Sequence, residues 1–546
     1  MTRRILGAAI GACVHVAGVL GFLRVAEEQG YEVEFLGAAL PIPVLLDAIQ
    51  DQAPNVVGIG YRLNIEGASR LFGELAQGIQ ERSLTGTKFV FGGTPSVARL
   101  AKETGIFDRV FSGSETSDDV ISYLRRRDDT QVQTQPPGTL LDRISSKRPF
   151  PLIRHHFGLP SLEDTIDGAR VLAEARVLDV LSLGPDQNAQ EHFMRPKEMR
   201  PEYDGAGGVP VRSEDDFRDI YEASRCGNYP LVRCYNGTRD LMKMAKMLLR
   251  TIHNAWCVLP LSWYSVLDGR SNRRIGEAAG ETQEVIRFHA EQGIPVEVNE
   301  AHQWSLRGSH DTVAVVMAFL AAYNAKKMGV RDYVAQYMFN TPLGMSPAMD
   351  LAKMLAKIEL IEGLHDDNFV SHREVRPGLL SFPSDPNLAK GQLAASVYLS
   401  MALRPEIVHV VAYSEGDHAA TPEEIIESCR IAKQVIDDSL MGLPDMTLDS
   451  KIQERKTELV QEAGALLEAM RGIAPEGTDD PWGDSRTLEG AIQLGFLDAP
   501  DLKGSQFARG TLVTRIIGGS CVAYDPINKR PLNECERISS IVTRDS

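Results

Sequence analysis

Apolar and amphipathic segments alternate from the start of the chain. Residues 4–10 form an apolar run of strand length, and residues 19–29 have apolar side chains at helical spacing. Gly30 ends that helix, and residues 31–36 predict a second strand. The alternation continues to about residue 127, which is typical of a doubly wound, flavodoxin-like α/β sheet. Such folds bind ligands at the carboxyl ends of their strands.

A second alternation follows a polar, proline-bearing stretch without periodicity. We place a linker at residues 128–149, between a first domain at 1–127 and a second at 150–440. The second domain contains eight strand candidates, at residues 151–156, 177–183, 229–234, 256–261, 294–299, 333–338, 369–374 and 407–413. Eight strands with helices between most of them predict a (β/α)8 barrel of the TIM type, with a second open sheet as the alternative. Residues 441–546 predict a helical and irregular extension packed on the barrel.

The amino-acid composition and the net charge limit the kinds of partner that the protein is expected to bind. The chain has 546 residues, enough for two or three domains, and a formal net charge of −16. This charge argues against nucleic acid or an anionic membrane as a partner. Seven cysteines are scattered without a C-x-x-C pair, which indicates reduced thiols and a cytoplasmic location.

A histidine lies in the loop after the first strand, in the pattern Cys13-x-His15-x-x-Gly18. A histidine at this sheet edge can reach a metal, while glycine lets a flat ligand approach the backbone. The alternative interpretation is a glycine-rich nucleotide loop with a solvent-facing histidine. The spacing resembles the D-x-H-x-x-G signature of cobalamin-binding domains, in which the histidine is the lower axial ligand of cobalt. That resemblance implies His15 as the cobalt ligand, with Cys13 at the aspartate position.

Three later segments strengthen the resemblance. Tyr61 and Leu63 lie at the position of the family's S-x-L segment, although the serine is absent. Gly92 and Gly93 end a strand where paired glycines face the nucleotide tail of the cofactor, and residues 107–116 are similar to the small subunit of glutamate mutase. The resemblance therefore implies a cobalamin-binding set of Cys13, His15, Gly18, Tyr61, Leu63, Gly92, Gly93, Ser112 and Gly113.

The second domain resembles the catalytic subunit of glutamate mutase, also called methylaspartate mutase. The similar segments are residues 285–299, 321–330, 494–501 and 510–524. The chain thus looks like a single-chain fusion of the two subunits, which implies an adenosylcobalamin-dependent isomerase that works by radical rearrangement, and a homodimer. A corrinoid-dependent methyltransferase and a cobalamin-binding protein without mutase activity are the alternatives.

The residues expected to contact the substrate differ from those of glutamate mutase. Glutamate mutase holds two substrate carboxylates with three arginines, and those positions fall at His156, at Gln190, and at Cys234 or Tyr235. The family's lysine and glutamate at the adenosyl ribose fall at Tyr413 and Asp417. Without the arginines an unpaired carboxylate would be buried at high cost, so we expect a small organic acid or amino acid other than glutamate.

Other candidates come from the positions of polar side chains. His155 and His156 alternate along one strand, and we expect His156 to face the barrel interior. Tyr264 and Arg270 belong to a polar, aromatic loop, and either Arg233 or Arg270 is expected to anchor an anion. Glu300 and His302 follow a strand end, whereas His409 shows no metal-ligand spacing. The predicted catalytic residues are His156, Gln190, Tyr235, Tyr264, Arg270, Tyr413 and Asp417.

Overall fold

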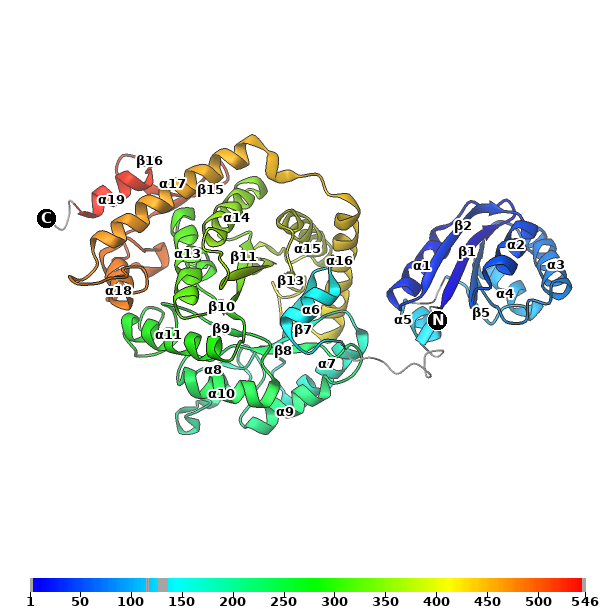
Figure 1. The fold of residues 1–546 in the computed structure, drawn as a ribbon, viewed down its shortest axis with the longest axis horizontal. Helices are drawn as coiled ribbons and strands as arrows, with labels where there is room; N and C mark the ends of the chain where they lie inside the picture. The colour runs from blue at the N-terminus through cyan, green and yellow to red at the C-terminus, as the bar shows by residue number, and fades with distance from the viewer. Residues whose placement is uncertain (1–2, 114, 116, 126–135, 543–546) are drawn as a thin grey trace. The chain divides into compact units, whose positions relative to one another are not determined.

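The computed structural model describes residues 3–113, 115, 117–125 and 136–542. The chain divides into two compact units, residues 1–134 and 135–546 (Figure 1). In the described part of the chain, no helix combines the length and apolar character needed to cross a bilayer.

The N-terminal unit is a doubly wound parallel sheet, as the alternation predicts. Its strands lie in the order β2-β1-β3-β4-β5 and span β1 (Arg4–Ile10), β2 (Glu32–Leu40), β3 (Val56–Tyr61), β4 (Lys88–Gly93) and β5 (Arg109–Phe111). The helices are α1 (Ala17–Glu28), α2 (Ile42–Gln52), α3 (Ile65–Glu81), α4 (Pro95–Thr104) and α5 (Ser117–Arg125). Side chains of α1 and α5 share one apolar cluster, and those of α2, α3 and α4 share another on the opposite face. The chain adds β2 on one side of β1 and adds β3, β4 and β5 on the other side, so the topological switch point lies between β1 and β3. Doubly wound folds bind ligands at this point.

Glycines on the inner strands let α1 approach the sheet closely. A Cβ atom at Gly60 would lie 2.5 Å from Cγ2 of Val19, and one at Gly58 would lie 2.9 Å from the ring of Phe22. Any larger side chain at these strand positions would push α1 outward.

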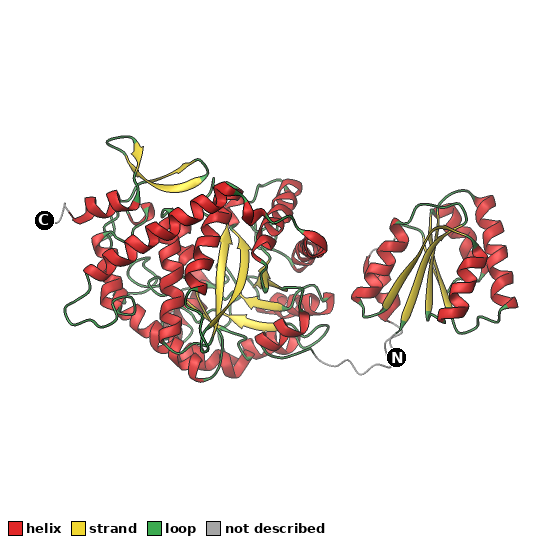
Figure 2. Ribbon diagram, turned by 45° about the horizontal axis from the view of Figure 1, so that its top comes forward, coloured by secondary structure: helices red, strands yellow, loops and turns green. Residues whose placement is uncertain are grey.

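The second unit contains a nearly closed parallel barrel (Figure 2). Its strands are β6 (Leu152–Phe157), β7 (Val180–Leu183), β8 (Leu231–Cys234), β9 (Cys257–Leu259), β10 (Val296–Val298), β11 (Asp332–Phe339), β12 (Val370–Pro377) and β13 (Ile407–His409). They pair in the order β8-β7-β6-β13-β12-β11-β10-β9. The ends β8 and β9 are joined by backbone hydrogen bonds from Ala255 to Val232 (2.9 Å) and from Asn236 to Val258 (3.3 Å). Each of the eight strand candidates overlaps one strand, and the predicted barrel is confirmed in this nearly closed form.

Helices surround the barrel, and a short helix covers its amino-terminal end. The outer helices are α7 (Leu162–Ala175), α8 (Gln187–His192), α9 (Glu214–Ala223), α10 (Leu241–Ile252), α11 (Ile275–Glu291), α12 (Ala301–Leu306), α13 (Asp311–Lys327), α14 (Pro347–Glu362), α15 (Pro386–Ser400) and α16 (Pro422–Gly442). Helix α6 (Leu140–Lys147) lies within the stretch expected as a linker. Its Leu140 and Ile144 pack against Leu152, Val180 and Leu231, near the starts of β6, β7 and β8. The barrel is thus sealed by apolar side chains at this end.

The last hundred residues pack against the barrel helices α11, α13 and α14. They form α17 (Ser450–Gly472), α18 (Ser485–Leu494), the strands β14 (Thr514–Ile517), β15 (Ser520–Asp525) and β16 (Arg530–Pro531), and α19 (Glu534–Val542). Helix α13 is buried along almost its whole length. Thr312 of α13 donates to Glu462 (2.6 Å) and Tyr323 donates to Asp480 (2.8 Å), so polar groups as well as apolar ones join this extension to the barrel.

Candidate functional site

The carboxyl edge of the N-terminal sheet carries the expected cobalt ligand. His15 lies between β1 and α1, and its side chain is exposed. Its Nδ1 atom lies 3.9 Å from Sγ of the buried Cys13. When one imidazole nitrogen binds a metal, the other normally donates to a firm acceptor, and a thiol sulfur is only a weak one. Nε2 of His15 is therefore the nitrogen available to a metal, with weak support from Cys13.

Open space lies beside glycines at the same edge. A Cβ atom added to the half-buried Gly92 would meet no heavy atom within 4 Å, and the same is true of Gly18 and Gly113. Gly93 differs, because its Cβ would lie 2.7 Å from the carbonyl oxygen of Tyr61. Gly92 thus borders a space that can receive a ligand, whereas Gly93 is required by close backbone packing.

An apolar rim surrounds the edge. Val14, Leu63 and Ile65 are exposed although they are large and hydrophobic. Tyr61 is buried instead, with its hydroxyl against Gly67 of α3, on the face of the sheet opposite α1. An exposed imidazole, an apolar rim and space beside a glycine together fit a cobalamin macrocycle and its tail.

The loop after β5 is held by an internal carboxylate. Glu115 accepts hydrogen bonds from the backbone nitrogens of Ser112 (2.7 Å) and Gly113 (3.0 Å) and from Oγ of Ser112 (3.0 Å). These bonds outweigh the effect of burial and lower the pKa of Glu115. The backbone nitrogens of Ser112 and Gly113 and the hydroxyl of Ser112 are therefore already engaged within the loop.

Charged side chains fill the middle of the barrel. Arg154 of β6, Arg233 of β8, Glu297 of β10 and Glu374 of β12 are all inaccessible to solvent. Nη2 of Arg233 donates to Glu297 (3.0 Å), and Arg154 pairs with Glu374. Nε2 of Gln336 bridges the two carboxylates, at 2.9 Å from Glu297 and 3.0 Å from Glu374. The four charges thus form one desolvated network, in which each charge has a partner of opposite sign.

The two carboxyl groups of this network differ in acidity. Burial would raise the pKa of Glu297, but the charges of Arg233 and Arg154 outweigh it and lower that pKa. For Glu374 burial dominates and raises the pKa. Burial and the charge of Arg233 lower the pKa of Arg154 to about 10. Glu297 is therefore the more firmly ionised carboxylate.

Aromatic rings lie beside the network. The ring of His156 stacks on Tyr235, with centroids 5.4 Å apart and planes 3° from parallel, and lies 4.7 Å from the ring of His409. Nη2 of Arg154 lies 3.0 Å from Nε2 of His156, so this nitrogen is the acceptor and Nδ1 carries the proton. His155 faces outward, where its Nε2 accepts from the backbone nitrogen of Ala412 (3.0 Å). His156 thus faces the interior, as the strand alternation predicts.

Several buried polar atoms of this interior have no hydrogen-bond partner among the described residues. They are Nε and Nη1 of Arg233, Oε2 of Glu374, Oε1 of Gln336 and Nδ1 of His409. Unpartnered buried polar atoms are rare in folded proteins and call for an explanation. His156, Tyr235 and Gln336 are only half-buried, so solvent reaches the interior. The interior therefore has both access and unused hydrogen-bonding capacity, as a ligand site requires.

The other predicted catalytic residues make contacts elsewhere. Gln190 donates to the carbonyl oxygen of Pro185 (2.7 Å), and Tyr413 donates to Glu427 of α16 (2.8 Å). Asp417 is exposed and accepts from His418. None of these side chains contacts the His156 cluster among the hydrogen bonds of the described residues.

The polar, aromatic loop after β9 is organised by local contacts. Arg270 lies over the ring of Tyr264, 4.6 Å from its centroid, and Nε of Arg270 is 3.9 Å from Asp268. Burial raises the pKa of Tyr264 to about 12, so its hydroxyl remains protonated at neutral pH. Glu300 accepts from the backbone nitrogens of Leu261 (2.6 Å) and Ser262 (3.1 Å), which ties this loop to β10.

The sequence does not identify most of the interior residues: Arg154, Glu297, Gln336 and Glu374 of the network, and also His409 and Arg376. His409, which shows no metal-ligand spacing in the sequence, lies against His156. Arg376 lies near the carboxyl end of β12, two residues after Glu374 and on the same strand face. The strand candidate at 369–374 ended before Arg376, although the alternation of Glu374 and Arg376 was a usable signal.

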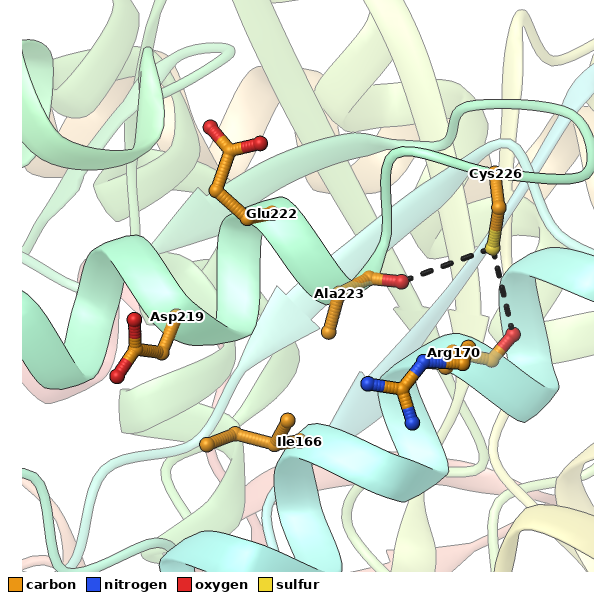
Figure 3. Close-up of a pocket in the computed structure, with 6 residues that line it drawn as sticks. All are labelled: Ile166, Arg170, Asp219, Glu222, Ala223 and Cys226. Carbon is orange, nitrogen blue, oxygen red and sulfur yellow. Dashed lines mark hydrogen bonds between the residues drawn. The ribbon is translucent and has the colours of Figure 1, made fainter.

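A separate hollow lies on the outer surface between α7 and α9 (Figure 3). It is lined by Ile166, Arg170, Asp219, Glu222, Ala223 and Cys226. Its charged side chains are exposed, and Sγ of Cys226 bonds weakly to the carbonyl oxygens of Arg170 (3.8 Å) and Ala223 (3.6 Å). Unlike the barrel interior, the hollow has no buried polar side-chain atom without a partner among its described lining residues.

Comparison with known proteins identifies the N-terminal unit. Residues 3–121 match the family model of the B12 binding domain. No curated protein matches the chain. Residues 3–121 therefore form a B12-binding domain, and cobalamin is the cofactor that this domain supports. Nothing in the match distinguishes glutamate mutase from other cobalamin proteins.

Solved structures show only partial likeness. A novel cobalamin-binding protein from Desulfitobacterium hafniense DCB-2 is 22% identical, with a TM-score of 0.21; the match covers 23% of this chain and 58% of that protein's length. A Rubisco-like protein from Rhodopseudomonas palustris is 8% identical, with a TM-score of 0.32. The match covers 56% of this chain and 69% of the Rubisco-like protein. The cobalamin-dependent S-adenosylmethionine radical enzyme OxsB is 13% identical, with a TM-score of 0.17. The match covers 88% of this chain and 63% of the OxsB chain. These likenesses add nothing to the family match.

Proposed function

We propose that this chain is an adenosylcobalamin-dependent radical mutase, an isomerase that rearranges a small organic acid or amino acid other than glutamate. One observation carries the proposal: a B12-binding domain at residues 3–121 is followed by a parallel barrel with unpartnered polar atoms in its interior. TIM-type barrels carry their active sites at the carboxyl ends of the strands. The barrel therefore supplies a substrate site, and the first unit supplies the cofactor.

The N-terminal residues hold the cofactor in this proposal. Nε2 of His15 would bind cobalt, the rim of Val14 and Leu63 would support the macrocycle, and the space at Gly92 would receive the nucleotide tail. When bound, adenosylcobalamin supplies an organic radical that can remove a hydrogen atom from a substrate. The barrel has to hold the substrate and keep water away from reactive groups.

The barrel residues serve the substrate. His156 and Tyr235 form one half-buried wall, and the network of Arg154, Arg233 and their glutamates fixes the floor beneath it. By resemblance, the three arginine positions of glutamate mutase fall at His156, at Gln190, and at Cys234 or Tyr235, so we expect the two-carboxylate clamp of that enzyme to be missing. This difference supports a substrate other than glutamate or methylaspartate.

Electron paramagnetic resonance tests the reaction class. The full chain is mixed anaerobically with adenosylcobalamin and, in turn, with mono-acids, basic amino acids, glutamate and methylaspartate. A mutase gives a coupled Co(II)–organic radical signal that requires both cofactor and substrate. Methyl transfer from methylcobalamin without such a signal would replace the proposal with a corrinoid methyltransferase, and binding without either reaction would indicate a cobalamin carrier or sensor.

The axial ligand is tested without turnover. Protein labelled with ¹⁵N-histidine is loaded with Co(II) cobalamin, and the superhyperfine splitting of the cobalt signal is recorded. An axial ¹⁴N splits each line into a triplet and ¹⁵N into a doublet, so a change from triplet to doublet identifies a histidine ligand. His15→Ala should lose the doublet and weaken binding by at least about tenfold, with the exposed Gln77→Ala as control. A triplet in the labelled protein would contradict the assignment.

We propose a homodimer as the assembly, by resemblance to glutamate mutase. Light scattering of the full chain should give twice the mass of a 60.0 kDa protomer. A single species at the protomer mass would contradict the proposal.

A further inference from the structure

We propose that the substrate carries a single carboxylate and that Arg376 binds it; this inference rests on the function proposed above and names its substrate class. Arg376 is half-buried on β12. Among the described residues, its guanidinium makes one long hydrogen bond, from Nε to the carbonyl oxygen of Pro377 (3.4 Å). No carboxylate of the described residues lies within 4.0 Å of its guanidinium, unlike those of Arg154 and Arg233.

The strand alternation directs Arg376 into the barrel. On β12, Arg373 faces outward and pairs with Glu362 of α14 (2.6 Å), whereas Glu374 faces inward to Arg154. Arg376 shares the face of Glu374 and lies two residues, or about 6.6 Å, closer to the carboxyl end. This places its guanidinium between the buried network and the mouth of the barrel.

Three histidines around this position are neutral. Burial lowers the pKa of His156, His302 and His409 well below the usual range, and the positive charge of Arg376 contributes to the lowering at each of them. The same charge therefore acts on side chains of β6, α12 and β13. Neutral imidazoles offer hydrogen bonds but do not compensate Arg376.

The interior consequently has a surplus of positive charge. Three arginines, Arg154, Arg233 and Arg376, face two glutamates, Glu297 and Glu374, and the two glutamates are already paired. A half-buried guanidinium without a counter-charge is a good partner for a carboxylate, which it can bind through two parallel hydrogen bonds. One bound carboxylate removes the surplus.

The remaining free atoms suit neutral groups. Nε and Nη1 of Arg233 are unpartnered, but the charge of this residue is compensated by Glu297, so they suit a hydroxyl or carbonyl oxygen. Oε2 of Glu374 and Oε1 of Gln336 are free acceptors. A second carboxylate would find no second uncompensated guanidinium here. Arg270, the other expected anchor, lies near Asp268 and is 43% exposed.

Ligand binding without cobalamin tests the inference separately from catalysis. Isobutyrate, its neutral isostere isobutyramide, and the dicarboxylate glutarate are titrated onto the full chain at constant ionic strength, by calorimetry and by thermal shift. We expect isobutyrate to bind, isobutyramide not to bind, and glutarate to bind no tighter than isobutyrate. Arg376→Gln should weaken isobutyrate binding by about 10- to 100-fold, as for a lost charge-assisted pair. Arg376→Lys should keep part of the affinity.

Controls separate binding from folding. Arg287→Gln, on the exposed face of α11, should leave isobutyrate binding unchanged. Since Arg376 has no acidic partner, Arg376→Gln should not lower the Tm of the free protein. Equal binding of isobutyrate and isobutyramide, unchanged affinity in Arg376→Gln, or markedly tighter binding of glutarate would each overturn the inference. Carboxylate binding through Arg376 without any radical signal would instead overturn only the proposed mutase.

Discussion

Replacing Glu297 by glutamine removes one charge from the buried network at almost constant volume. Glu297 accepts hydrogen bonds from Arg233, from Gln336 and from Nε1 of Trp256 (2.8 Å). A glutamine retains an acceptor oxygen for Trp256 but cannot neutralise Arg233. The variant therefore leaves a fully buried guanidinium without a counter-charge, in an interior that already has a surplus of positive charge.

The size of the effect follows from burial. Breaking a buried ion pair by removing one partner costs about 3–5 kcal/mol, because the remaining charge stays desolvated. Unfolding of the second unit, with about 400 residues, has an entropy near 0.8 kcal/mol per kelvin at about 2.1 cal/mol/K per residue. The Tm of this unit should therefore fall by about 4–6 °C.

Differential scanning calorimetry measures this shift. The exposed Glu284→Gln on α11 is the matched control and should change Tm by less than about 1 °C. The double variant Arg233→Met/Glu297→Met removes both charges and should recover much of the loss. If Glu297→Gln were as stable as the control, the side chains of Arg233 and Glu297 would not form a desolvated pair.

Two further predictions concern other parts of the chain. Cys13→Asp should strengthen cobalamin binding by about 10- to 100-fold in an absorbance titration, because a carboxylate orients His15 better than a thiol does, and unchanged affinity would contradict that role. Burial alone would raise the pKa of Glu534, but Arg537 and His310 lower it to about 2 from 4.5. The unfolded chain thus binds the proton more readily, so about 3 kcal/mol of stability present above pH 4.5 is lost as the pH falls towards 2. The free energies of unfolding of wild type and Glu534→Gln, measured with denaturant, should become more similar as the pH falls over this range. A difference that stays constant with pH would contradict the lowered pKa of Glu534.

The fold was predictable because most strands are apolar runs bounded by turns. Every one of the eight barrel candidates overlaps a strand, and the first sheet follows its alternation. Helix α6 was missed because Leu140 and Ile144 are two apolar positions in a short segment that adjoins a polar stretch. Such a helix is stabilised by the barrel end on which it packs, which local sequence does not reveal.

The barrel interior was harder to predict. The sequence of β12 from His372 to Arg376 reads as a charged surface, because its inward positions are themselves charged. Alternation still places His156 correctly, since it depends only on strand geometry. By contrast, Tyr413 and Asp417 came from alignment with a resembling family, and alignment does not specify the direction of a side chain.

The burial of α13 has a consequence for synthesis of the chain. This helix has almost no polar outer stripe, unlike an ordinary barrel helix, and α17 covers it. About 120 residues separate the two helices, so at about 5–20 residues per second the ribosome takes roughly 6–24 s to reach α17. During this interval an apolar helix face is exposed on the nascent chain, so we expect the barrel to be prone to aggregation until the residues of α17 emerge.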